Sequence, residues 1–225
     1  MYPTIYFHKA TRAAEKLFSV LILRIISLVR DGHLSKIGLQ KSHPIVRFAT
    51  EPDSLDNALA LDDTVFWGSL PMLVDSRDEQ IQECAKRLRE RRLPKCIDIR
   101  HILATKIGLG PTTPFRQRGE LKKRLERSIA SIETKLSTWA KANSTGAPRI
   151  LTDRAVRDPY RRFEESKGPL NQIHIRLSGS EVLDVASCSP VIAAIESFEL
   201  FRAYTDDSEA RSVVERVVNA QLRGN

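Results

Sequence analysis

Side chains that could hold a catalytic metal ion are scattered along the 225-residue chain rather than grouped. A metal that activates water for hydrolysis needs several histidine, aspartate or glutamate ligands. No histidine here precedes an aspartate, because the residues that follow the five histidines are Lys9, Leu34, Pro44, Ile102 and Ile175. The patterns HExxH, GxxxxGK[ST] and GxSxG are also absent. The sequence therefore predicts no catalytic residue and no metal site in this chain.

Basic side chains, in contrast, are abundant and clustered. The net charge is +8 and the pI is about 9.6, which favours nucleotides, nucleic acid or a membrane surface as partners. One cluster runs from Arg87 to Lys95, and others span residues 116–127 and 154–162. A soluble protein with a basic surface is the alternative interpretation.

The cysteines and the hydropathy of the chain indicate in which cellular compartment the protein is found. Cys84, Cys96 and Cys188 form no CxxC pair, which favours reduced thiols in a cytoplasmic protein. The apolar run from Leu17 to Val29 contains Arg24 and is shorter than the roughly 20 residues that a membrane span requires. We therefore expect no membrane partner.

Apolar periodicity predicts a mainly helical first half. Residues 6–31 have apolar side chains at three- and four-residue spacing, wide enough for a helix buried on much of its circumference. Asp62-Asp63 and Asp78 are typical N-terminal caps of the next two helices. A heptad-like seam from Leu121 to Trp139 predicts a long helix whose stripe belongs to the core, with a subunit contact as the alternative.

The last third alternates apolar and polar residues. We expect short strands at 96–99, 173–177, 182–185 and 198–204, and a final helix from Asp206 to Leu222. Helices followed by a small antiparallel sheet with helices indicate an α+β fold that is mainly helical. The division that we predict is a helical part (1–99), a loop with a long helix (100–145) and a small α+β region (146–225).

Several sequence blocks, in this order, resemble HD-domain phosphohydrolases of the dNTP triphosphohydrolase type. The blocks are Tyr6-Phe7-His8-Lys9 with Arg12, Leu59 to Phe66 with its paired aspartates, Leu88 to Lys95, and Asp158-Pro159-Tyr160 with Ile173 to Leu177. In that family the first block lies downstream of the metal-binding histidines and aspartates. The chain thus resembles the C-terminal part of such an enzyme, without its catalytic HD motif.

The resemblance implies roles for five residues. Tyr6 is similar to a tyrosine that lines the dNTP sugar and base pocket, and His8 and Lys9 are similar to residues that reach an effector nucleotide at a subunit junction. Arg91 and Lys95 resemble a pair that contacts another effector nucleotide. Each has a simpler alternative: Tyr6 as a core aromatic, His8 and Lys9 as solvated residues, and Arg87 to Lys95 as a basic helix end favoured by the dipole.

Our leading hypothesis is a C-terminal fragment or truncated homologue of a dNTP triphosphohydrolase, inactive by itself. It would bind nucleoside triphosphates and pack against an upstream HD domain or further copies of itself as a homo-oligomer. No cofactor is expected in this chain, although the resemblance implies a divalent metal in the full-length enzyme. The alternative is a non-catalytic basic adaptor that binds nucleic acid or a protein partner, as the clusters at 116–127 and 154–162 suggest.

Overall fold

The computed structural model describes residues 5, 7–143, 146–157, 160, 173–176, 182–195 and 197–224. The α-helices are α1 (Lys9–Arg30), α2 (Pro44–Thr50), α3 (Leu55–Leu59), α4 (Asp63–Val74), α5 (Glu79–Arg89), α6 (Ile99–Lys106), α7 (Phe115–Ala142), α8 (Val185–Cys188), α9 (Pro190–Ala193) and α10 (Ser208–Arg223), and η1 (Leu34–Lys36) is a 3-10 helix. The strands are β1 (Lys95–Asp98), β2 (Ile150–Arg157), β3 (His174–Arg176), β4 (Val182–Asp184) and β5 (Phe198–Thr205).

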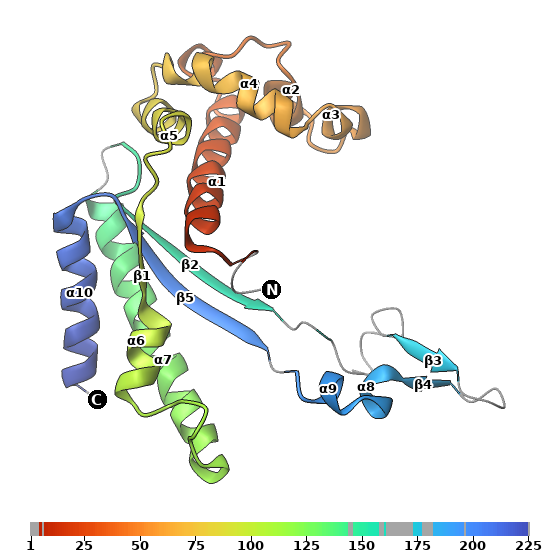
Figure 1. Cartoon of the computed structure of the whole chain (residues 1–225). Coiled ribbons are helices and arrows are strands. Elements are labelled where there is room, and N and C mark those ends of the chain that lie inside the picture. Colours follow the sequence, from red (N-terminus) through yellow and green to blue (C-terminus); the bar gives the residue numbers. More distant parts are fainter. Residues whose placement is uncertain are drawn as a thin grey trace. The chain divides into compact units, whose positions relative to one another are not determined.

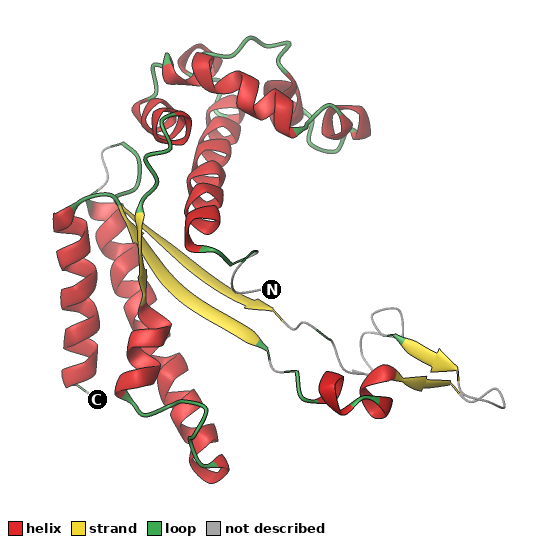
Figure 2. Cartoon of the chain, viewed as in Figure 1, coloured by secondary structure: helices red, strands yellow, loops and turns green. Residues whose placement is uncertain are grey.

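These elements form the mainly helical α+β fold that the sequence predicts (Figure 2). One sheet has the order β1-β5-β2, with β1 and β5 antiparallel and Ile97 opposite Ala203. A second sheet pairs β3 with β4, also antiparallel. The chain divides into two compact units, residues 1–153 with 201–225, and residues 154–200.

The three-stranded sheet in the first unit separates two apolar cores. Tyr204 and Leu151 join α1, α2, α4 and α5 in one core. Ile150, Phe201 and Ala203 join α6, α7 and α10 in the other. Figure 1 shows α7 and α10 together on one side of the sheet and α1 on the other. Because neighbouring residues of a strand point to opposite faces, β5 contributes to both cores.

Local capping explains where several helices begin. Asp62 and Asp78 accept hydrogen bonds from the backbone N–H groups of Val65 and Ile81, at 2.7 and 3.1 Å, which confirms both predicted N-terminal caps. The first helix begins at Lys9 rather than at residue 6, since the His8 side chain caps it. Val185 belongs to α8 and not to a strand, because the Asp184 carboxylate caps a helix there.

One face of α1 is fully buried and the other is not. Ala13, Leu17, Leu21, Ile25 and Leu28 are at most 2% exposed, whereas Leu23 is 66% exposed. The fully buried stripe is therefore narrower than the periodicity suggested. Ile22 and Ile26, which widen it, are half-buried and line an open groove, and Ile22 also packs against the core. Within the described residues, none of the helices has both the length and the apolar character needed to cross a bilayer.

A buried carboxylate joins α1 to the sheet. Asp153 on β2 is 0% exposed, and its carboxylate accepts a 2.8 Å hydrogen bond from Nε of Arg12 and lies 3.2 Å from Nζ of Lys16. Burial by itself would raise the pKa of Asp153, but the hydrogen bond and charge of Arg12, with Lys16, outweigh it and lower that pKa. The ion pairs thus fix the first half of α1 on the sheet.

Substitution of the α1 stripe tests its burial. Leu21→Asp places a charge without a partner in the core, and we expect it to lower the free energy of unfolding by about 3–5 kcal/mol. Leu23→Asp, on the exposed face, is the matched control and should leave stability within about 0.5 kcal/mol of wild type. Urea denaturation of both variants measures the difference, and equal midpoints would show that the stripe is not a core.

The pairing of Asp153 predicts an acid dependence. Asp153→Asn leaves Arg12 and Lys16 beside a neutral buried group, which should destabilise the fold by about 3 kcal/mol at neutral pH. Folding lowers the pKa of Asp153. The ionised carboxylate therefore stabilises the fold at pH values above the pKa of the unfolded state, and this stabilisation is lost as the pH falls through the lower pKa of the folded state. Urea unfolding at several pH values should therefore show wild type approaching the variant below about pH 4. A constant gap, or an equal effect of Asp53→Asn at the exposed surface, would contradict the assignment.

Candidate anion-binding site

A basic pocket lies where α5 ends and the chain turns into β1. Its volume is about 640 Å³. The lining residues come from α1, α5, the turn, β1 and the segment after β5, and they are Ala10, Arg87, Arg91, Arg92, Leu93, Pro94, Lys95 and Asp206. Four of these side chains are cationic and one is acidic, so the pocket favours an anion.

The backbone at the end of α5 holds Arg91 in a left-handed conformation, with φ of 55°. The N–H of Arg91 donates to the carbonyl of Leu88 at 3.3 Å, and the N–H of Arg92 donates to the carbonyl of Arg87 at 2.9 Å. These two bonds form a Schellman motif, in which glycine usually takes the left-handed position. Arg91 is the only non-glycine residue with positive φ among those that the structure describes. The left-handed conformation costs about 1–2 kcal/mol for an L-residue.

Two of the four cations are already neutralised by carboxylates. Arg87 donates to Glu83 at 2.8 Å and to Asp206 at 2.7 Å. Arg92 donates to Glu90 at 2.6 Å. In the part of the chain that the structure describes, the side chains of Arg91 and Lys95 form neither a hydrogen bond nor an ion pair. The free positive charge of the pocket therefore comes from the two residues that the sequence analysis assigned to an effector nucleotide.

The Arg87–Asp206 pair supports one wall of the pocket. Burial acts to lower the pKa of Arg87, but Glu83 and Asp206 together raise it. Burial raises the pKa of Asp206, and the charge of Arg87 offsets only part of that effect. The contact between the two side chains joins α5 to the strand end that precedes α10.

Three of the predicted nucleotide contacts, Tyr6, His8 and Lys9, lie near the N-terminus, and only part of this segment lies at the basic pocket. Ala10 lines the pocket, and the preceding Lys9 interacts electrostatically with Cys96, which follows Lys95. His8 uses Nδ1 to accept a 3.3 Å hydrogen bond from the N–H of Ala10, so its observed role is to cap α1. Tyr6 lies outside the described residues, and its contact with a nucleotide stays a prediction.

Asp206 is the pocket residue that sequence reasoning did not single out. It lies 119 residues from Arg87, and its only sequence signal was a place at the start of the final helix. Arg87 and Arg92 were recognised as basic but not as wall residues with carboxylate partners. Glu83 and Glu90 are local partners, four and two residues before the arginines that they pair with. No local pattern could assign Asp206, since its place beside Arg87 depends on the way β5 returns beside β1.

In the described ranges, the aspartate, glutamate, histidine and cysteine side chains form no metal centre. No three of them lie close enough together to hold a metal ion. His43 instead caps α2 through Nδ1, and burial lowers its pKa. Cys84 is buried, and desolvation raises the pKa of its thiol to about 12.

Comparison with known proteins gives a likeness in fold. No protein-family model and no curated protein sequence matches the chain. The crystal structure of a phosphohydrolase from Bacteroides thetaiotaomicron superposes with a TM-score of 0.52 at 18% sequence identity. The fold of this chain is therefore similar to that of part of this phosphohydrolase. The match covers 92% of this chain but 47% of the phosphohydrolase, so the chain spans about half the length of that protein.

Replacing the strained residue separates its structural effect from its binding effect. Arg91→Gly relieves the left-handed strain, and we expect the free energy of unfolding to rise by about 1 kcal/mol. The same change removes one of the two free cations, so affinity for inorganic triphosphate should fall. Arg92→Gly, at a residue without positive φ, is the control and should not stabilise the protein. Urea denaturation and calorimetric titration measure the two effects, and a variant that is less stable than wild type would contradict the strain.

Proposed function

We propose that this chain is the C-terminal part of an HD-domain dNTP triphosphohydrolase, or a truncated homologue of one, and that it binds a nucleoside triphosphate as an effector. The observation that carries the proposal is the pair of free cations, Arg91 and Lys95, in a pocket where Arg91 is held in a strained conformation. The phosphohydrolase-like fold supports it, as does the match to about half of a longer phosphohydrolase.

The triphosphate is the part of the ligand that these residues suit. The guanidinium of Arg91 offers a planar fork of donors to two phosphate oxygens, and the ammonium of Lys95 supplies a compact point charge. Lys9, near Cys96, adds positive charge at the α1 side of the pocket. Arg87 is held by Glu83 and Asp206, so it shapes the wall and does not need to reorganise when an anion binds.

The chemistry of the complete enzyme would be hydrolysis of a deoxynucleoside triphosphate to a deoxynucleoside and triphosphate. A divalent metal in such an enzyme needs several histidine and carboxylate ligands. The residues that the structure describes do not fit that metal, since they offer no group of three such ligands. In this proposal the reaction centre therefore belongs to another part of the enzyme, and this chain contributes binding and assembly surfaces.

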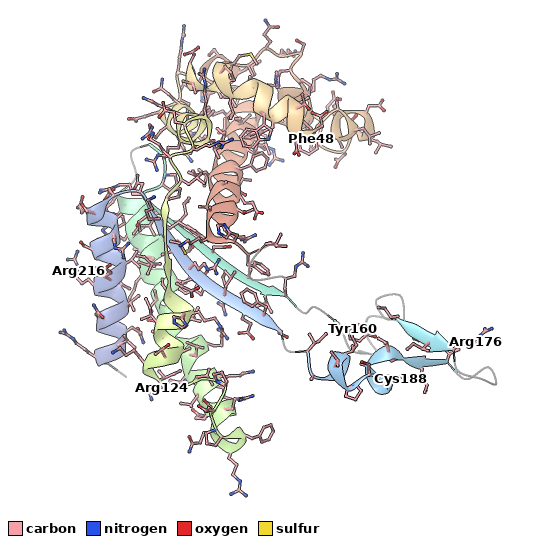
Figure 3. All side chains as sticks on the ribbon, viewed as in Figure 1. Phe48, Arg124, Tyr160, Arg176, Cys188 and Arg216 are labelled. Carbon is pink, nitrogen blue, oxygen red and sulfur yellow. The ribbon has the colours of Figure 1, made fainter. Side chains whose placement is uncertain are left out.

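An apolar groove on the helical side supports a larger assembly. The groove has a volume of about 250 Å³ and lies between α1, α2 and α4. It is lined by Phe18, Ile22, Ile26, Ile45, Phe48, Leu61, Asp62, Asp63 and Phe66, of which Figure 3 labels Phe48. Phe18 is 40% exposed, and Trp67 beside Phe66 is 54% exposed. Exposed aromatics around a groove are typical of a covered interface, and we assign the cover to the HD domain that precedes this region in the family.

The effector site predicts selective loss of nucleotide binding. Calorimetric titration of GTP, dATP and inorganic triphosphate should show weak binding to wild type and about a tenfold loss, or about 1.4 kcal/mol, in Arg91→Ala/Lys95→Ala. The three ligands should lose affinity by similar factors, since phosphate contacts dominate.

The control removes two equal charges elsewhere, as Lys41→Ala/Lys141→Ala at exposed positions. Nonspecific attraction would weaken binding equally in both double variants, and this outcome would overturn the assigned site. Steep weakening by salt is expected for both outcomes and does not by itself discriminate.

A further inference from the structure

The first turns of α7 carry a surface that the proposed effector site does not use. The helix begins at Phe115, but Leu125 is its first fully buried residue. Figure 1 shows this end of α7 reaching beyond α6 and α10, the helices that pack on its later turns. The Phe115 side chain is 90% exposed. An aromatic ring so exposed at the start of a helix has no role in the core.

Cationic side chains share the outer face of the same turns. Arg116, Lys123 and Arg127 are seven and four residues apart, so they align along the helix, opposite the buried stripe that contains Leu125 and Ile129. At 1.5 Å per residue, the steps between them are about 10 and 6 Å. Lys122 lies two turns above Phe115 on the neighbouring row. Together, Phe115, Arg116, Lys122, Lys123 and Arg127 are called the α7 surface below.

Most of this charge is not neutralised within the protein. Arg127 lies 3.3 Å from Glu120, but both side chains are more than 70% exposed, and such a surface pair contributes little. Within the residues described by the structure, Arg116, Lys122 and Lys123 take part in no ion pair. The surface therefore has at least three cations available for an external polyanion.

Gly119 leaves an open space between the ring and the cations. Glycine inside a helix costs about 1 kcal/mol relative to alanine. Gly119 does not have positive φ, and a Cβ placed there would meet no atom within 4 Å, so neither backbone nor packing explains it. It stands one turn above Phe115 on the same side of α7, where a side chain would crowd a flat group stacked on that ring.

We propose that the α7 surface binds single-stranded nucleic acid, with one base stacked on Phe115 beside Gly119 and the backbone phosphates along Arg116, Lys123 and Lys122. Single strands combine exposed base faces with phosphates, which is the combination that an exposed ring and a row of cations recognise. A duplex hides its base faces in the stack and would use the charges alone. An acidic protein would likewise make no use of the open ring face.

Fluorescence anisotropy with labelled oligonucleotides tests this binding on the whole chain. An oligothymidylate of twelve nucleotides should bind more tightly than a twelve-residue abasic strand with the same phosphates. Phe115→Ala should weaken binding of the oligothymidylate about tenfold and leave the abasic strand unchanged. Phe115→Trp should retain wild-type affinity and Phe115→Leu should not, because only the former keeps an aromatic face.

A charge-matched comparison locates the phosphate contacts. Arg116→Gln/Lys122→Gln/Lys123→Gln should reduce binding to both strands and flatten the dependence of affinity on salt, by a slope of about 2. Lys41→Gln/Lys141→Gln/Arg216→Gln removes the same charge from other exposed positions, with Arg216 on the side of α10 turned away from α7 (Figure 3), and should have little effect.

The outcomes separate this proposal from the effector site. Equal binding of the two strands, equal effects of the two triple variants, or full competition by polyglutamate at matched charge would overturn it. Arg91→Ala/Lys95→Ala should leave oligonucleotide binding intact, whereas the α7 triple variant should leave triphosphate binding intact. Loss of one binding activity without the other therefore shows which proposal has failed.

Discussion

The buried carboxylate of Asp153 is the interaction on which the arrangement of the first unit depends. A carboxylate without exposure to water is tolerable only with cations held close to it, and Arg12 and Lys16 on α1 supply them. These pairs hold the first turns of α1 beside β2. Ala10 thereby becomes a wall of the basic pocket beside Lys95. The position of the candidate site is therefore a consequence of a charge that must be neutralised on β2.

Much of the fold was predictable from sequence because its determinants are local. Asp62 and Asp78 cap helices two or three residues away, and the apolar seam of α7 repeats within a few turns. Strand β2 and helix α6 were not predicted. The partner of β2 is β5, almost fifty residues along the chain, and the arginines in β2 suggested a charge cluster. Ile150 and Leu151 belong to different cores, so both faces of β2 are buried at its start and no alternation of apolar and polar residues marks it.

The candidate site shows the same contrast between local and distant determinants. Sequence reasoning selected Arg91 and Lys95 through a resemblance, and the structure brings them to one pocket. Nothing in the sequence indicates that Arg91 takes a left-handed conformation, because the residue usually found there is glycine. The neutralisation of Arg87 by Asp206 was equally invisible, as it requires the end of β5 to return beside α5. The charges were countable from composition, but which of them remain free follows only from tertiary structure.

The central position of β5 in its sheet has a consequence for the order of events during synthesis. Residues 198–205 contact segments of the chain that leave the ribosome much earlier. Lys95 pairs with Thr205 across the sheet, and Arg202 donates a hydrogen bond to the carbonyl of Phe7, 195 residues earlier. Until β5 emerges, β1 has no strand partner and one face of α6 and α7 lacks its sheet. Helices α1 to α5 can collapse early through local contacts, whereas the pocket-bearing junction must wait for almost the whole chain.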